Sequence, residues 1–224
     1  MRTVIFDLDG TLADTSGDLA AAANATLAAI GLGTPIDAEA DRRVTYLGGR
    51  AMLRLGAARA GAPAFADAEL DRHYLSLIGH YGAALDRHTR LFPGVLDALD
   101  RLADDGWRLG ICTNKPAHLA EDLLVRLGVR PRFASMIGAD TLPVRKPDPA
   151  PLIESIARAG GRTSHAALVG DTLTDRETAR RAGIPSILVT FGGDGPEEVA
   201  RHAPEALIDD FAALDAALAR LVPL

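Results

Sequence analysis

Short apolar runs alternate with segments of helical period from residue 92 to the end of the chain. Apolar residues spaced three to four apart predict helices, whereas short continuous apolar runs predict buried strands. In the first helical segment the repeat is formed by Leu96, Leu99, Leu102 and Ala103, and Gly106 ends it. The predicted helices cover 94–107, 116–129, 149–161, 175–183 and 210–221. The predicted strands cover 108–114, 134–140, 165–171, 185–191 and 205–209, together with an opening strand at 3–7.

Strands separated by helix-length segments imply right-handed crossovers and a parallel sheet that is covered on both faces. Residues 15–88 do not show this alternation of strands and helices, because they contain three alanine-rich helical segments and no convincing strand. We therefore expect a doubly wound α/β core formed by residues 1–14 and 89–224, with an all-helical insert at 15–88.

Composition narrows the class of protein. The chain has 224 residues, 48% of them hydrophobic, which is enough for a substantial core. It contains neither a run of eighteen apolar residues nor a charged start that leads into an apolar segment, so we expect a cytoplasmic protein. The net charge of −6 argues against binding to nucleic acid or to a membrane surface. The single cysteine, Cys112, excludes an internal disulfide and is expected to be a packed strand thiol.

The stretch VIFDLDGTLADT at residues 4–15 places two carboxylates, Asp7 and Asp9, directly after an apolar run. Side chains two apart in an extended segment point to the same side, so the two charges repel each other unless a cation lies nearby or one is protonated. An ordinary turn at Asp9-Gly10 is the alternative interpretation of this stretch alone.

Polar side chains also follow the other predicted strands. In an open parallel sheet, ligands bind at the carboxyl ends of the strands. Each of these groups has a simple alternative, since a helix cap or a turn would use the same residue types. Together they are better explained as one site. The residues are Thr113 and Asn114, Lys146 in the loop RKPDP, and Asp171 and Asp175 in GDTLTD.

These residue types suit one kind of chemistry. Clustered aspartates offer the hard oxygen ligands that Mg²⁺ prefers, and a bound Mg²⁺ would let Asp7 and Asp9 both stay ionised. A hydroxyl, backbone N–H groups and a lysine form an anion site. A magnesium ion beside an anion site indicates phosphoryl transfer. Only Lys115 and Lys146 are lysines among the 24 Lys and Arg residues. A codon bias toward arginine is the simple explanation for this count, and it makes the two lysines candidates for positions that need a compact point charge.

The motifs DLDGT, TN, KPDP and GDTLTD, in this order, resemble the four motifs of the haloacid dehalogenase superfamily of phosphotransferases. The resemblance covers nearly the whole chain and includes a helical cap inserted after the first motif. It implies that Asp7 is the nucleophile that forms an aspartyl-phosphate. Asp9 would protonate the leaving alcohol and later take a proton from water.

The same resemblance implies roles for the remaining motif residues. Thr113 and the backbone of Asn114 would hold the phosphoryl oxygens, and Lys146 would neutralise the intermediate. Asp171 would ligate Mg²⁺ with Asp7 and the backbone carbonyl of Asp9. Asp175 would bind metal-bound waters or orient Lys146.

Within the superfamily, LADTSGDL, LGGRAMLRL and RLFPGVLDAL are similar to segments of phosphoglycolate phosphatases. Asp9 speaks against a dehalogenase, which has no leaving alkoxide to protonate. Related hexose-phosphate mutases usually place a histidine where this chain has Asp18, and members that cleave phosphonates use a cap lysine, which 15–88 lacks. Arg176, Glu177 and Thr178 stand where relatives often carry smaller or apolar residues, which weakens the assignment to this subfamily.

We therefore expect a Mg²⁺-dependent phosphatase for a small organic phosphomonoester, with 2-phosphoglycolate as the first candidate. A sugar-phosphate or nucleotide phosphatase is the second, and a mutase or a non-catalytic phosphate-binding protein is a further alternative. The chain would act as a monomer or homodimer. Arg50 is a candidate contact for an anionic substrate group or a solvated helix residue, and Lys115 is a candidate substrate contact or a surface charge.

Overall fold

The computed structural model describes residues 1–223, which form two compact units. Unit 1 consists of Met1–Ala13 and the chain from Leu91 onward, and unit 2 is Asp14–Arg90. The predicted insert, 15–88, lies within two residues of the bounds of unit 2 at either end. No helix within residues 1–223 is long and apolar enough to cross a membrane.

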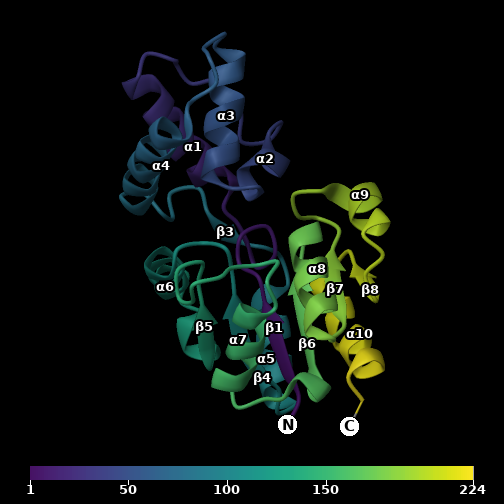
Figure 1. Cartoon of the computed structure of the whole chain (residues 1–224). Helices are drawn as coiled ribbons and strands as arrows, with labels where there is room; N and C mark the ends of the chain where they lie inside the picture. Colours follow the sequence, from purple (N-terminus) through teal and green to yellow (C-terminus); the bar gives the residue numbers. More distant parts are fainter. Residues whose placement is uncertain (224) are drawn as a thin grey trace. The chain divides into compact units, whose positions relative to one another are not determined.

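Unit 1 is built around a six-stranded sheet in the order β5-β4-β1-β6-β7-β8, in which every neighbouring pair is parallel (Figure 1). The chain starts at the centre with β1, moves outward through β4 to β5, and then crosses back to β6 on the other side of β1. The order of the strands therefore reverses at β1. The strands are β1 (Thr3–Phe6), β4 (Arg108–Cys112), β5 (Ser135–Ile137), β6 (Ala166–Gly170), β7 (Ser186–Val189) and β8 (Ala206–Ile208).

Helices cover both faces of this sheet. The helices α7 (Ala150–Arg158) and α8 (Leu173–Ala182) pack on one face, over β1, β4, β5, β6 and β7. The helices α5 (Val95–Asp104) and α10 (Leu214–Leu221) pack against each other and against β4 and β8, on the opposite face that right-handed crossovers require. The remaining elements are α6 (Ala117–Arg126), α9 (Gly195–Arg201) and three 3₁₀ turns, η1 (Arg130–Arg132), η2 (Thr163–His165) and η3 (Phe211–Ala213).

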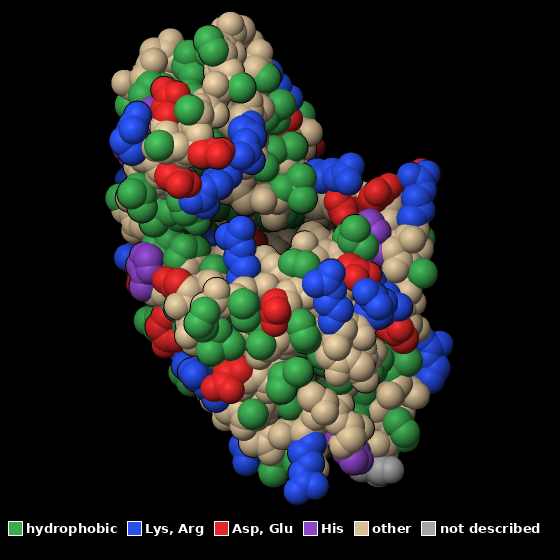
Figure 2. Space-filling model, in the orientation of Figure 1, with side chains coloured by type: hydrophobic (Ala, Val, Ile, Leu, Met, Phe, Trp, Pro, Cys, Tyr) green, Lys and Arg blue, Asp and Glu red, His purple; other side chains and the backbone are tan. Residues whose placement is uncertain are grey.

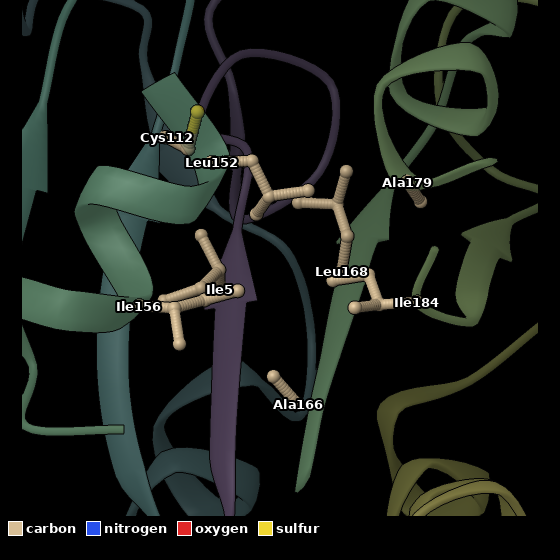
Figure 3. Close-up of a cluster of buried hydrophobic side chains, with 8 residues drawn as sticks. All are labelled: Ile5, Cys112, Leu152, Ile156, Ala166, Leu168, Ala179 and Ile184. Atoms are coloured by element: carbon tan, nitrogen blue, oxygen red, sulfur yellow. The ribbon is translucent and has the colours of Figure 1, made fainter. Parts of the chain in front are cut away.

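A cluster of buried side chains joins α7 and α8 to the sheet (Figure 3). Ile5 of β1 and Leu168 of β6 meet Leu152 and Ile156 of α7, and all four are at most 1% exposed. Burying each such side chain stabilises the fold by about 1.5–3 kcal/mol. Cys112 belongs to the same cluster, and burial raises the pKa of its thiol to about 12. The expectation of a packed strand thiol at Cys112 is confirmed.

The structure corrects the predicted apolar stripe of α5. Its buried residues are Val95, Ala98, Leu99 and Leu102, whereas Leu96 is 45% exposed and Ala103 is also exposed. The stripe is shifted because Ala98 and the first-turn Val95 fill the face against the sheet together with Leu99 and Leu102. The short helix α9 was not predicted, since its sequence GPEEVAR carries one buried apolar residue, Val199.

Unit 2 is a small helical bundle. Its helices are α1 (Ser16–Ala29), α2 (Arg42–Tyr46), α3 (Gly49–Arg59) and α4 (Asp67–Gly82). The alanines of α1 permit close packing with α3 and α4, and a Cβ atom at Gly56 of α3 would collide with Leu27 of α1. Two short strands, β2 (Ala13–Asp14) and β3 (Arg90–Leu91), pair where the chain passes between the units.

Asp18, in the first turn of α1, has a structural role within unit 2. Its carboxylate is 2% exposed and accepts hydrogen bonds from the backbone N–H groups of His88 and Thr89, at 2.9–3.1 Å, and from the Thr89 hydroxyl at 2.8 Å. This carboxylate therefore joins the first helix of unit 2 to its last residues.

We predict that Asp18→Ala destabilises the protein, because it leaves buried donors at His88 and Thr89 without an acceptor. The expected loss in the free energy of unfolding is about 2–3 kcal/mol, measured by urea denaturation. The control is Asp97→Ala, which removes an exposed carboxylate in the first turn of α5. Equal stability of the two variants would contradict this role for Asp18.

Candidate active site

Asp7 and Asp9 follow β1, the strand at which the order of the sheet reverses. Ligands bind at this point in open α/β sheets because the connections on either side of it diverge. The backbone N–H of Asp7 still donates to the Val169 carbonyl of β6 at 2.9 Å, and the Leu8 N–H donates to Asp7 Oδ1 at 2.7 Å. The carboxylate of Asp7 is thus held at the end of the sheet.

Lys146 lies between Asp7 and Asp175. Its Nζ atom is 3.1 Å from Asp7 Oδ2 and 2.6 Å from Asp175 Oδ1, and its side chain is 2% exposed. Burial acts to lower the pKa of this ammonium, but the carboxylates of Asp175 and Asp7 outweigh burial and raise the pKa above its ordinary value. Lys146 is therefore a permanent buried positive charge beside Asp7.

Asp171, which follows β6, is fully buried and oriented through both carboxylate oxygens. Oδ1 accepts a hydrogen bond from the Thr11 hydroxyl at 3.1 Å, and Oδ2 accepts one from the Gly193 N–H at 3.1 Å. A Cβ atom at Gly192 would collide with Asp171, so the loop after β7 needs glycine there. Sequence reasoning missed Thr11, Gly192 and Gly193, although a glycine pair at a strand's carboxyl end was a usable signal.

Asp175 is held by the start of α8. Its Oδ2 atom accepts hydrogen bonds from the Thr172 hydroxyl at 2.7 Å and the Thr172 N–H at 3.1 Å, which completes a capping box with Thr172. Its other oxygen contacts Lys146. Both roles expected for Asp175 stay predictions, since it contacts Lys146 and also lies close to Asp7 and Asp171.

Three carboxylates form a cluster that suits a hard cation. One oxygen atom from each of Asp7, Asp171 and Asp175 lies within 4.8 Å of the others. Burial and the neighbouring carboxylates of Asp175 and Asp9 raise the pKa of Asp7 to about 6, against the opposing effect of Lys146. Burial, with Asp175 and Asp7, raises the pKa of Asp171 well above its ordinary value. Ionised carboxylates are costly here, and an all-oxygen set of this kind fits a divalent metal.

Asp9 is paired with Lys115. The Lys115 ammonium lies 2.8 Å and 3.0 Å from the two oxygens of Asp9, and the Lys115 side chain is 3% exposed. The alternative interpretation of Lys115 as a surface charge is therefore wrong. Asp9 does not belong to the cluster of three carboxylates, and its role as a metal ligand through the backbone carbonyl stays a prediction.

Thr113 and Asn114 follow β4, next to β1. The Thr113 hydroxyl oxygen accepts a hydrogen bond from the Lys115 N–H at 3.2 Å, and the Asn114 side chain donates to the Lys146 carbonyl at 3.0 Å. The Asn114 amide thus ties the loop after β4 to the loop that carries Lys146. Asp7, Asp9, Thr113, Asn114, Lys115, Lys146, Asp171 and Asp175 all belong to unit 1.

Arg50 belongs to unit 2 and is engaged within it. Its guanidinium donates to Asp71 Oδ1 at 2.6 Å and 3.1 Å and lies 4.0 Å from the centre of the Tyr74 ring. An ion pair and a cation–π contact therefore fix the guanidinium on the surface of the bundle. On the face drawn in Figure 2, basic and acidic side chains are interspersed.

The comparisons with known proteins agree with this geometry. Residues 4–189 match the model of the family described as haloacid dehalogenase-like hydrolase. The chain is 40% identical to a phosphoglycolate phosphatase from Agrobacterium fabrum over 96% of this chain and 91% of the relative. It is 41% identical to a phosphoglycolate phosphatase from Mesorhizobium japonicum, over 96% and 94% of the two chains.

A solved structure extends the likeness to the fold. The crystal structure of a predicted phosphoglycolate phosphatase from Haemophilus somnus superposes with a TM-score of 0.85 at 27% identity and covers 96% of this chain and 97% of the other. Phosphatases of this family generally use a divalent metal, and the cluster of Asp7, Asp171 and Asp175 fits one. The chain belongs to the haloacid dehalogenase-like hydrolases and is a phosphoric monoester hydrolase.

Proposed function

We propose that this protein is a Mg²⁺-dependent phosphatase that hydrolyses 2-phosphoglycolate through a phosphoaspartate at Asp7. The observation that carries the proposal is the position of Asp7. Its carboxylate lies at the switch point of the sheet, 3.1 Å from a buried ammonium and within 4.8 Å of two further carboxylates. The names of the relatives near 40% identity support the choice of substrate.

In the first half of the reaction, an oxygen of Asp7 attacks phosphorus in line with the leaving oxygen. The bond between phosphorus and the leaving oxygen breaks, and Asp9 gives its proton to that oxygen. Lys146, the Thr113 hydroxyl and the Asn114 backbone N–H neutralise and orient the phosphoryl oxygens. Asp7, Asp171 and the Asp9 carbonyl would hold a Mg²⁺ ion, which would supply further positive charge for these oxygens.

In the second half, water attacks the phosphoaspartate, and Asp9 takes the proton of that water. Phosphate leaves, and Asp7 returns as a carboxylate. Asp175 keeps Lys146 in place throughout, because its Oδ1 atom is 2.6 Å from Nζ.

The test is an assay of the purified protein with Mg²⁺ against 2-phosphoglycolate, hexose phosphates and nucleotides. We expect release of inorganic phosphate, with the highest kcat/KM for 2-phosphoglycolate, and a loss of at least about 10³-fold in Asp7→Asn. A preference for hexose phosphates or nucleotides would favour the second candidate. No release by a folded protein with bound Mg²⁺ would favour a phosphate-binding protein, or a mutase whose acceptor is missing.

Metal binding should depend on pH because a proton and the cation compete for the same carboxylates. Since the pKa of Asp7 is raised to about 6, Asp7 is ionised above that pH and protonated below it. We expect the apparent Kd for Mg²⁺ to rise at least about tenfold for each pH unit below 6, because the raised pKa of Asp171 adds a second competing proton, measured by isothermal titration calorimetry from pH 5 to 8. The Asp7→Asn control should show a shallower dependence, and identical slopes would contradict this assignment.

We propose that Arg50 contacts the substrate carboxylate. Its ion pair with Asp71 offers the alternative that Arg50 acts within unit 2, and the experiment below distinguishes the two roles. We expect Arg50→Ala to lower kcat/KM for 2-phosphoglycolate about tenfold while leaving ethyl phosphate unchanged. The control is Arg54→Ala, which removes an exposed arginine from the same helix. Equal losses on the two substrates would show that Arg50 acts within unit 2 rather than on the substrate.

A further inference from the structure

The ammonium of Lys115 holds both carboxylate oxygens of Asp9, at 2.8 Å and 3.0 Å. Asp9 keeps 18% of its side chain exposed, whereas Lys115 is 3% exposed. One donor that contacts both oxygens limits rotation of a carboxylate more than a single hydrogen bond does. The buried Lys115 side chain therefore sets the orientation of the more exposed Asp9 side chain.

The backbone that carries Lys115 is itself fixed. Its N–H donates to the Thr113 hydroxyl at 3.2 Å, and its carbonyl accepts from the Ala139 N–H at 2.9 Å. Two residues later, the Ala117 N–H donates to Asp140 Oδ1 at 2.8 Å. A Cβ atom at Gly138 would collide with the Ala117 backbone, so the loop after β5 lies directly against the start of α6. The backbone of Lys115 is therefore held in place just after the carboxyl end of β4, and the side chain extends from there.

We propose that Lys115 is a positioning residue for Asp9: its ammonium stays on one oxygen of the Asp9 carboxyl group, while the other oxygen carries the proton that passes to the leaving oxygen. This inference rests on the proposed function, in which Asp9 is the general acid. An acid must lie within hydrogen-bond reach of the atom it protonates, at about 2.6–3.2 Å. A small displacement of the carboxylate is therefore costly to catalysis.

This role explains why the chain keeps a lysine at this position. The ammonium is a compact point charge with three donors, which suits two oxygens of one carboxylate in a tight space, whereas the planar guanidinium is wider. The two lysines of the chain have separate partners: Lys146 contacts the proposed nucleophile, and Lys115 contacts the proposed acid. The structure thus gives each aspartate of the first motif its own buried cation.

The test uses the dependence of the rate on the leaving group. Ethyl phosphate and 2-phosphoglycolate have poor leaving groups that need a proton, whereas 4-nitrophenyl phosphate releases a stable anion without one. We expect Lys115→Met to lower kcat/KM about 100-fold for the first two substrates and less than about 5-fold for 4-nitrophenyl phosphate. Thermal unfolding and circular dichroism of each variant establish that the fold is retained.

Two further variants calibrate the experiment. Asp9→Asn removes the acid and should show the same selectivity for poor leaving groups, with a larger loss. Arg158→Met removes an exposed cation paired with Glu154 at the end of α7 and should leave all three rates unchanged. If Lys115→Met does not fold, Lys115→Arg keeps the charge but displaces Asp9, and should show a smaller loss with the same selectivity.

Three results would overturn the proposal. Equal losses on all three substrates would mean that Lys115 only supports the fold, and a loss confined to 2-phosphoglycolate would mean that it contacts the substrate carboxylate. Selectivity for poor leaving groups in Asp9→Asn but not in the Lys115 variants would mean that Asp9 needs no such support. If Asp9→Asn itself lacks this selectivity, the assignment of Asp9 as acid fails, and that failure is separate from any defect at Lys115.

Discussion

The balance of charge at the carboxyl edge of the sheet constrains the rest of the molecule. Four carboxylates and two ammonium groups gather there: Asp7 and Asp175 contact Lys146, and oxygens of Asp7, Asp171 and Asp175 lie within 4.8 Å of one another. The raised pKa values of Asp7 and Asp171 show that these groups do not stabilise the fold in their ionised forms. The sheet and its helices must hold them in place against their mutual repulsion.

The scaffold holds these groups in place because glycine backbone packs closely against residues in and around the site. Glycines 170, 192 and 138 each stand where a Cβ atom would collide with Asp175, Asp171 or the Ala117 backbone. Short turns then bring the carboxylates within reach of backbone N–H groups and hydroxyls, as at Thr11, Thr172 and Gly193. Asp171 and Asp175 are therefore oriented in part by hydroxyls and backbone N–H groups, which add no charge to the site.

Much of the core was predictable because strand ends obey a general rule. Asp7, Thr113 and Asp171 follow neighbouring parallel strands, so their proximity followed from the alternation of strands and helices. The Lys115–Asp9 pair was not predictable, since the direction of a long flexible side chain is set by the loop contacts at Ala139 and Asp140. The stripe of α5 was misjudged at Leu96 because helical period alone does not distinguish alternative apolar faces.

The pairing of β2 with β3 has a consequence for how such a protein can change. The chain leaves unit 1 after Ala13 and returns at Leu91, and these two points lie side by side because the short strands pair. An intervening segment whose ends already meet closes its loop without straining the sheet, so its length and sequence are free to vary. A different helical bundle spliced in at these positions would leave Asp7, Lys146 and Asp171 where they are. The fold therefore allows the inserted unit to change while the charged residues at the end of the sheet are kept.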